Sequence, residues 1–197
     1  MIHGTTQIYG VIGDPISHSL SPSLQNPAFA ALGMDAVYVT FRVSPSSLGD
    51  ALRGLLALNV QGINVTVPHK SDVFQYLDEV TDTARKIGAV NTLRNDSGHW
   101  IGENTDAIGF IRSLKPLKLN LSGSSVGMLG AGGAARGVAV GLLEAGVSQL
   151  HICNRNHARA VALVELLHSK HAHIPFRNTN LRSFNPILYR RMMPTRS

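Results

Sequence analysis

The sequence GAGGAA at residues 130–135 constrains the fold of this chain more than any other stretch. It closes a predicted strand, SVGMLGA, and opens a predicted helix of about 133–145. Glycines in the pattern G-x-G-x-x-G/A permit a tight turn and let backbone N–H groups approach a pyrophosphate at the helix N-terminus. The sequence therefore predicts a dinucleotide site. Its candidate residues are Gly130, Ala131, Gly132, Gly133 and Ala134. A glycine-rich helix start needed only for close packing is the alternative interpretation.

The end of the next predicted strand, QLHICN at 149–154, indicates which dinucleotide fits. An NAD site usually places an acid there to accept a hydrogen bond from the ribose 2′-hydroxyl. This chain has no acid at that point and carries two arginines four residues apart. Guanidinium groups one helical turn apart suit a 2′-phosphate, so the pattern favours NADP over NAD. The candidates are Asn154, Arg155, Asn156 and Arg159. Two solvated arginines on an exposed turn are the alternative.

Strand-like and helix-like segments alternate along the chain, which is typical of an α/β protein. The expected strands are 7–13, 36–43, 64–67, 125–131 and 149–154, with a hairpin of AVNTLRN and HWIGE closed by NDSG. Helices are expected from Ser21–Pro22 to Leu32, after Ser44–Pro45, and at 105–114, 133–145 and 157–170, with Ser21 and Ser44 as N-caps. In the second of these helices Leu48, Leu52, Leu55 and Leu56 form one apolar stripe.

The segment KPLKLNLSGSS at 115–125 is the best domain boundary, because proline, serine and glycine gather there. The sequence predicts an N-terminal domain of 1–114 with an open, mostly parallel sheet. An incomplete Rossmann-like domain of 115–175 with only two identifiable strands is expected to follow, and then an atypical basic tail of 176–197 without a clear period.

The net charge of +6 belongs mainly to that tail. Five of the 18 Lys and Arg residues lie in 176–197 beside no acid, which leaves 13 cations against 12 anions elsewhere. A nearly neutral body argues against nucleic acid as a partner. No apolar run has transmembrane length, so a membrane partner is not expected either. The single cysteine forms no internal disulfide or metal cluster, so a cytoplasmic protein without metal is expected.

Six segments together resemble shikimate dehydrogenase, in the family's order and spacing: HSLSP (18–22), NVTVPHK (64–70), GAVNT (88–92), GENTDAIG (102–109), GAGGAARG (130–137) and NRNHAR (154–159). The resemblance implies a substrate domain and a Rossmann-like cofactor domain, with the active site in the cleft between them. It implies reduction of 3-dehydroshikimate to shikimate with NADPH, in the pathway to chorismate and the aromatic amino acids. The expected partner is this small-molecule substrate, and the expected state is a monomer or homodimer.

The resemblance assigns Lys70 and Asp106 as the catalytic pair. Hydride transfer to or from a carbinol carbon requires a proton to move on the oxygen, and a lysine beside that oxygen can give or take it. The carboxylate can orient both the hydroxyl and the ammonium group. In isolation, a lysine just past a strand is more typical of a solvated surface charge.

The same resemblance assigns the substrate contacts. Ser19 and Ser21 would bind the carboxylate, although simple helix capping is an alternative for them. Thr66 and Asn91 would bind ring hydroxyls; Asn64 would join them or be structural. Asp82 aligns with a position on the cofactor side of the cleft, and a helix-surface acid is an equal alternative. His18 and His69 are expected to pack or to bond loops.

Nothing after Lys170 matches the family's later segments, which include a further Rossmann strand and a helix that returns a glutamine to the substrate. The sequence-based hypothesis is a chain that keeps the catalytic pair but has weak or no activity unless something completes the fold. The alternatives are a truncated non-catalytic remnant that binds shikimate or nucleotide, and a quinate/shikimate dehydrogenase. A related folate dehydrogenase is disfavoured, because the double-serine loop suits a small carboxylated ring.

Overall fold

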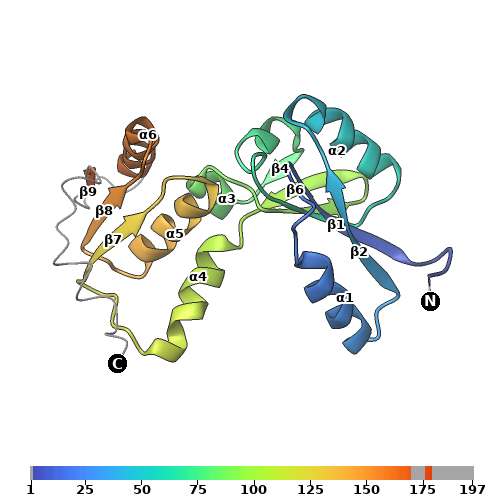
Figure 1. The fold of residues 1–197 in the computed structure, drawn as a ribbon, viewed down its shortest axis with the longest axis horizontal. Helices are drawn as coiled ribbons and strands as arrows, with labels where there is room; N and C mark the ends of the chain where they lie inside the picture. The colour runs from blue at the N-terminus through green and yellow to red at the C-terminus, as the bar shows by residue number, and fades with distance from the viewer. Residues whose placement is uncertain (1, 170–175, 179–197) are drawn as a thin grey trace. The chain divides into compact units, whose positions relative to one another are not determined.

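The computed structural model describes residues 2–169 and 176–178 and divides the chain into two compact units, Met1–Asp106 and Ala107–Ser197 (Figure 1). This division lies at the start of a helix, Asp106–Leu114, that the sequence-based boundary keeps whole in the first domain. The boundary after Leu114 stays a prediction.

A six-stranded sheet organises the first unit, in the order β2-β1-β3-β5-β6-β4. The central strand β1 runs parallel to both β2 and β3, β4 runs parallel to β6, and the β3–β5 and β5–β6 pairs are antiparallel. The prediction of an open, mostly parallel sheet is confirmed. The strands are β1 (Gln7–Gly13), β2 (Ala36–Arg42), β3 (Gly62–Val65), β4 (Glu79–Val80), β5 (Thr92–Asp96) and β6 (His99–Glu103).

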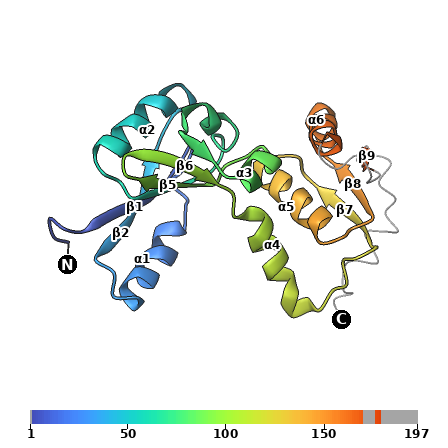
Figure 2. The same ribbon diagram turned by 180° about the vertical axis from the view of Figure 1, so that it is seen from behind.

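Helices of this unit begin near serine or threonine residues, as expected. They are α1 (Ser21–Ala31), η1 (Pro45–Ser47), α2 (Leu48–Ala57), η2 (Asp72–Tyr76) and α3 (Asp82–Ile87). The predicted stripe of α2 is confirmed, because Leu48, Leu52 and Leu55 are buried in one core with Ile63 and Trp100. Helix α1 lies beside β2 in both views (Figures 1 and 2).

Two local predictions are wrong. Ser21 is the first residue of α1 and its side chain caps nothing; instead the Ser19 hydroxyl accepts a hydrogen bond from the Ser21 N–H at 3.3 Å. Strand β3 begins and ends two residues earlier than predicted. Its pairing with β1 starts at Gly62, where glycine leaves room for the ring of Tyr9, and strand propensity alone does not indicate that.

The second unit carries three parallel strands in the order β7-β8-β9. Its elements are α4 (Asp106–Leu114), whose first residue belongs to the first unit, η3 (Lys115–Leu117), β7 (Ser125–Leu129), α5 (Gly133–Glu144), β8 (Gln149–Cys153), α6 (His157–His168) and β9 (Phe176–Asn178). The expectation of only two strands, with an irregular tail from 176, is wrong, because residues 176–178 form the third strand, β9. A strand of three residues is too short to show the alternation of apolar and polar residues by which a strand is recognised in a sequence. Its pairing with β8 defines it instead. Residues 179–197 of the predicted tail lie outside the described residues.

Helix α5 supplies much of the core of the second unit. Ala139, Val140 and Leu143 are buried, as are Leu150 and Ile152 of β8. Within the part of the chain that the structure describes, no helix has the length and apolar character needed to cross a bilayer.

Candidate functional site

The loop that follows β3 holds Lys70 in place. His69 is fully buried, and its Nε2 lies 2.8 Å from the carbonyl oxygen of Val43. The His69 N–H donates to the Thr66 carbonyl, and the Lys70 carbonyl accepts from the N–H of Val90 at 2.8 Å. The expectation that His69 packs and bonds the loop is confirmed. These hydrogen bonds fix the backbone of Lys70. One of them comes from Val90, the residue before Asn91.

Lys70 and Asp106 form an ion pair, with 2.6 Å between Nζ and Oδ2. Their side chains are 15% and 22% exposed, so both are largely removed from water. Asp106 begins α4, and its N–H donates to Oδ1 of the buried Asn104 at 2.9 Å. Asn104 is anchored in turn by donating to the carbonyl of Ala89 at 2.7 Å. The structure thus brings together the two residues that the sequence pairs.

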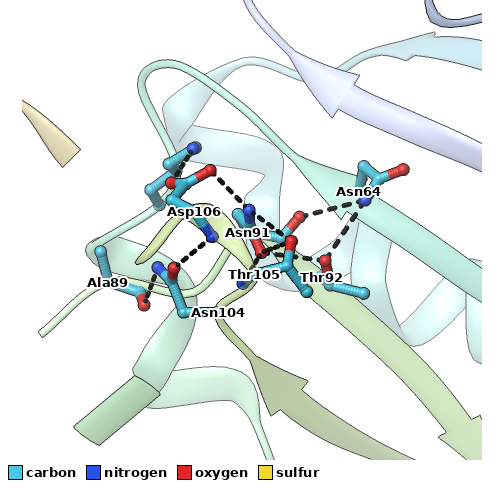
Figure 3. A network of polar contacts seen from close by, with 8 residues as sticks. Asn64, Ala89, Asn91, Thr92, Asn104, Thr105 and Asp106 are labelled. Atoms are coloured by element: carbon cyan, nitrogen blue, oxygen red, sulfur yellow. Dashed lines mark hydrogen bonds and ion pairs between the residues drawn. The ribbon is translucent and has the colours of Figure 1, made fainter. Parts of the chain in front are cut away.

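Asn91 orients the second oxygen of that carboxylate (Figure 3). Its Nδ2 donates to Oδ1 of Asp106 at 2.7 Å and to Oγ1 of Thr105 at 3.0 Å, which uses both amide hydrogens. Its Oδ1 accepts from the Thr105 N–H at 3.0 Å and from the Thr92 hydroxyl at 2.9 Å. A ligand that takes a hydrogen bond from Asn91 must replace one of these partners.

Thr92 and Thr105 were not assigned a role from the sequence, although each belongs to the site network in Figure 3. Both follow an asparagine, in GAVNT and in GENTD. The recurrence of the pair Asn-Thr was the available signal. Thr92 also receives a hydrogen bond from Nδ2 of Asn64 at 3.3 Å, which joins β3 to the network.

The first unit also holds a cavity of about 290 Å³. Its lining includes Ser19, Ser21 and Thr66, three of the predicted substrate contacts, together with the exposed His18. The predicted residues at 64, 70, 91 and 106 do not line the cavity. A backbone bond connects the two sets of residues: Val65, which precedes the lining residue Thr66, donates its N–H to the carbonyl of Asn91 at 2.8 Å.

The glycine turn between β7 and α5 combines a positive φ with open space at the start of a helix. Gly130 has φ +118°, a conformation that other residues adopt with strain, and its N–H donates to the Cys153 carbonyl at 2.7 Å. Gly132 is the N-cap of α5, and no atom lies within 4 Å of where its Cβ would be. The free N-terminus of a twelve-residue helix and the open space above it fit a pyrophosphate.

The bond from Gly130 to Cys153 also sets the turn against the end of β8, where the predicted NADP residues follow. Asn156 is the N-cap of α6, and Asn154 donates to the Asn156 carbonyl at 2.8 Å. Arg155 and Arg159 are exposed and make no ion pair with any residue in 2–169 or 176–178. Two unpaired guanidinium groups beside this turn fit a phosphate-bearing ribose.

Asp82 stands apart from the network around Lys70. It is exposed in the first turn of α3, whose N-cap is Thr81. An acid is favourable at that end of a helix, so the local structure accounts for it without a ligand.

Two family models match the sequence. Residues 11–93 match the shikimate dehydrogenase substrate binding domain, and residues 113–185 match shikimate / quinate 5-dehydrogenase. The chain is 48% identical over 166 residues to a shikimate dehydrogenase (NADP(+)) of Caldanaerobacter subterraneus subsp. tengcongensis, covering 84% of this chain and 59% of that protein. A protein of the same name from Methanothermobacter thermautotrophicus is 50% identical over 165 residues, covering 84% and 58%. The chain thus spans less than two thirds of the length of these relatives.

Solved structures agree with this match. Shikimate dehydrogenase from Aquifex aeolicus superposes with a TM-score of 0.84 at 43% identity, covering 91% of this chain and 65% of that one. Shikimate 5-dehydrogenase from Listeria monocytogenes, in complex with shikimate and NAD, gives 0.85 at 38% identity, covering 92% and 64%. The Thermus thermophilus enzyme, in complex with NADP(H) and shikimate, gives 0.77 at 35% identity, covering 87% and 63%.

Proposed function

The chain belongs to the shikimate dehydrogenase family, and we propose that it acts as an oxidoreductase that reduces 3-dehydroshikimate to shikimate with NADPH, on the route to chorismate and the aromatic amino acids. The observation that carries the proposal is the 2.6 Å ion pair between Lys70 and Asp106, which the buried Asn91 and Asn104 hold in place. Residues 1–114 would bind the substrate and the following domain the cofactor. The single Cys153, a free thiol, fits a reducing cytoplasm, and we propose a monomer or homodimer there.

Lys70 would donate the proton that the substrate oxygen needs. An ammonium group has three N–H donors, and the bond to Asp106 occupies one of them. A second can point at the carbonyl oxygen of the substrate, where its N–H bond breaks as the new O–H bond forms. Asp106 holds the amine in one position and stabilises its charge, while Asn91 fixes the carboxylate. The pair is therefore preorganised for proton transfer.

Ser19, Ser21 and Thr66 would bind the substrate from the cavity. Serine hydroxyls near the first turn of α1 can donate to a carboxylate, and the helix N-terminus favours the negative charge. Thr66 and Asn64 would contact ring hydroxyls. Because such groups stay unpaired beside an analogue that lacks the hydroxyl, they would provide specificity.

The glycine turn, with Asn154 to Asn156 and Arg159, would hold the dinucleotide. NADPH, when bound there, supplies the hydride that becomes the new C–H bond. Arg155 and Arg159 would bind the 2′-phosphate, which explains the absence of an acid in the sequence after β8 as far as Val164.

The test is oxidation of shikimate by the 197-residue chain with NADP. The reaction is monitored through the absorbance of the reduced cofactor. We expect Lys70→Met to lower kcat by about 10²- to 10⁴-fold, because the proton donor is lost. NADP affinity should not change. Lys115→Met, at an exposed lysine of η3, is the matched control and should leave kcat as it is.

Full turnover by Lys70→Met would refute the role of this lysine. Calorimetry that shows shikimate and NADP binding to a chain without turnover would refute the enzymatic proposal and support a non-catalytic binding protein instead. Binding of quinate in preference to shikimate would redirect the proposal to the quinate branch of the family.

A further inference from the structure

Tyr38 is the buried side chain that links the cavity to the polar network. It lies on the edge strand β2 and is 5% exposed. Its ring packs with Val11 and Ile16. Its hydroxyl donates to Oδ1 of Asn64 at 2.6 Å, a short bond.

The strand register explains how these two residues meet. Tyr38 pairs with Tyr9 across β1 and β2, and Asn64 pairs with Val11 across β1 and β3. Tyr9 and Val11 are two residues apart on β1, so their partners share one face of the sheet. Tyr38 and Asn64 therefore face each other over the central strand.

The Tyr38 backbone is fixed as well. Asn26 of α1 accepts from the Tyr38 N–H at 2.8 Å and donates to its carbonyl at 3.0 Å. An edge strand lacks a neighbouring strand on one side, and the Asn26 side chain supplies the backbone hydrogen bonds that such a strand would make with Tyr38. With its backbone, ring and hydroxyl all held, Tyr38 is a rigid hydrogen-bond donor.

The other contacts of Asn64 define the orientation of its amide. Nδ2 lies 3.3 Å from the carbonyl oxygen of Asn91 and 3.3 Å from Oγ1 of Thr92. A backbone carbonyl only accepts, so the nitrogen must face it and Oδ1 must face Tyr38. Both amide hydrogens are then used, and one lone pair of Oδ1 is left for a ligand.

We propose that Tyr38 is a positioning residue for substrate recognition: it locks the Asn64 amide so that Asn64 offers a ligand only an acceptor, and so selects a ring hydroxyl. This inference rests on the proposed function of the site. A hydroxyl donates to that lone pair, whereas a carbonyl or ether oxygen meets it with repulsion. Burial raises the pKa of Tyr38 to about 12, so the phenol keeps its proton at every physiological pH. Ser21, on the cavity wall, acts on that pKa in the opposite direction, which places a second predicted substrate contact beside the phenol.

The test is a double-mutant cycle on the full 197-residue chain, with shikimate affinity measured by calorimetry. Tyr38→Phe keeps the ring and removes only the donor; we expect shikimate to bind about 5- to 30-fold more weakly. Because Tyr38 acts through Asn64, adding Tyr38→Phe to Asn64→Ala should change the affinity by less than about twofold. NADP affinity should stay the same in all variants. Tyr9→Phe is the matched control, since its hydroxyl donates to the exposed side chain of Gln7 at 3.2 Å and not to Asn64.

A second readout does not need a ligand. The side-chain amide resonances of Asn64 should shift in Tyr38→Phe and not in Tyr9→Phe. If the wild-type chain does not bind shikimate, the proposed function fails, and this inference with it. If wild type binds and Tyr38→Phe binds equally well, or if the two substitutions act additively, the inference alone is overturned.

Discussion

Single side chains in this protein are fixed by partners from distant segments. Asp106 has one oxygen on Lys70 and the other on Asn91, while its N–H is bonded to Asn104. Each of these contacts uses a different atom of the aspartate, so none competes with another. A carboxylate held in this way loses little further freedom when a substrate binds. At the residue scale, preorganisation is therefore built from asparagine amides.

Tyr38 leads to a prediction on alkaline stability. Burial raises the pKa of its phenol from the usual value of 10.0 to about 12 in the folded chain. Between about pH 10 and pH 12 the unfolded state holds fewer protons than the folded state, so the free energy of unfolding falls as pH rises. Below pH 10 both states are protonated and the full stability remains. From pH 9 to pH 11 wild type should lose about 1 kcal/mol more than Tyr38→Phe in urea unfolding. Equal losses would show that the phenol is accessible to water.

At the scale of one element, α2 offers a matched pair of glycines. A methyl group at Gly54 would meet no atom within 4 Å, whereas one at Gly49 would lie 2.7 Å from the ring of Tyr76. Gly54→Ala should stabilise the protein by about 0.5–1 kcal/mol, because alanine has the higher helix propensity. Gly49→Ala should destabilise it by about 1–3 kcal/mol through overpacking. Urea unfolding of the two variants measures both changes, and a gain in stability for Gly49→Ala would contradict the packing of Tyr76 on α2.

Sequence patterns predicted the elements that carry a period or a motif, such as the apolar stripe of α2 and the glycine turn before α5. They failed where the bounds of an element depend on strand pairing or on a single side-chain contact. Strand β9 has three residues and is defined by its register with β8, and the start of β3 depends on the room that Gly62 leaves for Tyr9. Nothing in the sequence pattern indicates that Tyr38 differs from other strand residues. Its hydroxyl meets Asn64 because of the register of three strands, which the sequence pattern does not reveal.

At the scale of the whole molecule, the two predicted ligands belong to different units. The predicted substrate contacts and the pair of Lys70 and Asp106 all lie within Met1–Asp106. The glycine turn and the arginines after β8 lie within Ala107–Ser197. Each ligand should therefore stabilise the unit that binds it, since a ligand that binds only the folded state opposes unfolding.

Hydrogen exchange of the full chain measures this directly. At about 100 times its Kd, shikimate should slow exchange of protected amides in β3 and β5 by up to about 100-fold, and NADP should do the same for β7 and α5. Gly132→Val is the matched control. Its extended φ of −88° accepts valine and no atom lies within 4 Å of the new Cβ, so the fold tolerates the side chain while the pyrophosphate loses its space. That variant should lose the protection by NADP and keep the protection by shikimate. Protection of β7 and α5 by NADP in Gly132→Val would show that the dinucleotide binds elsewhere, and the cofactor site proposed at the glycine turn would then be wrong.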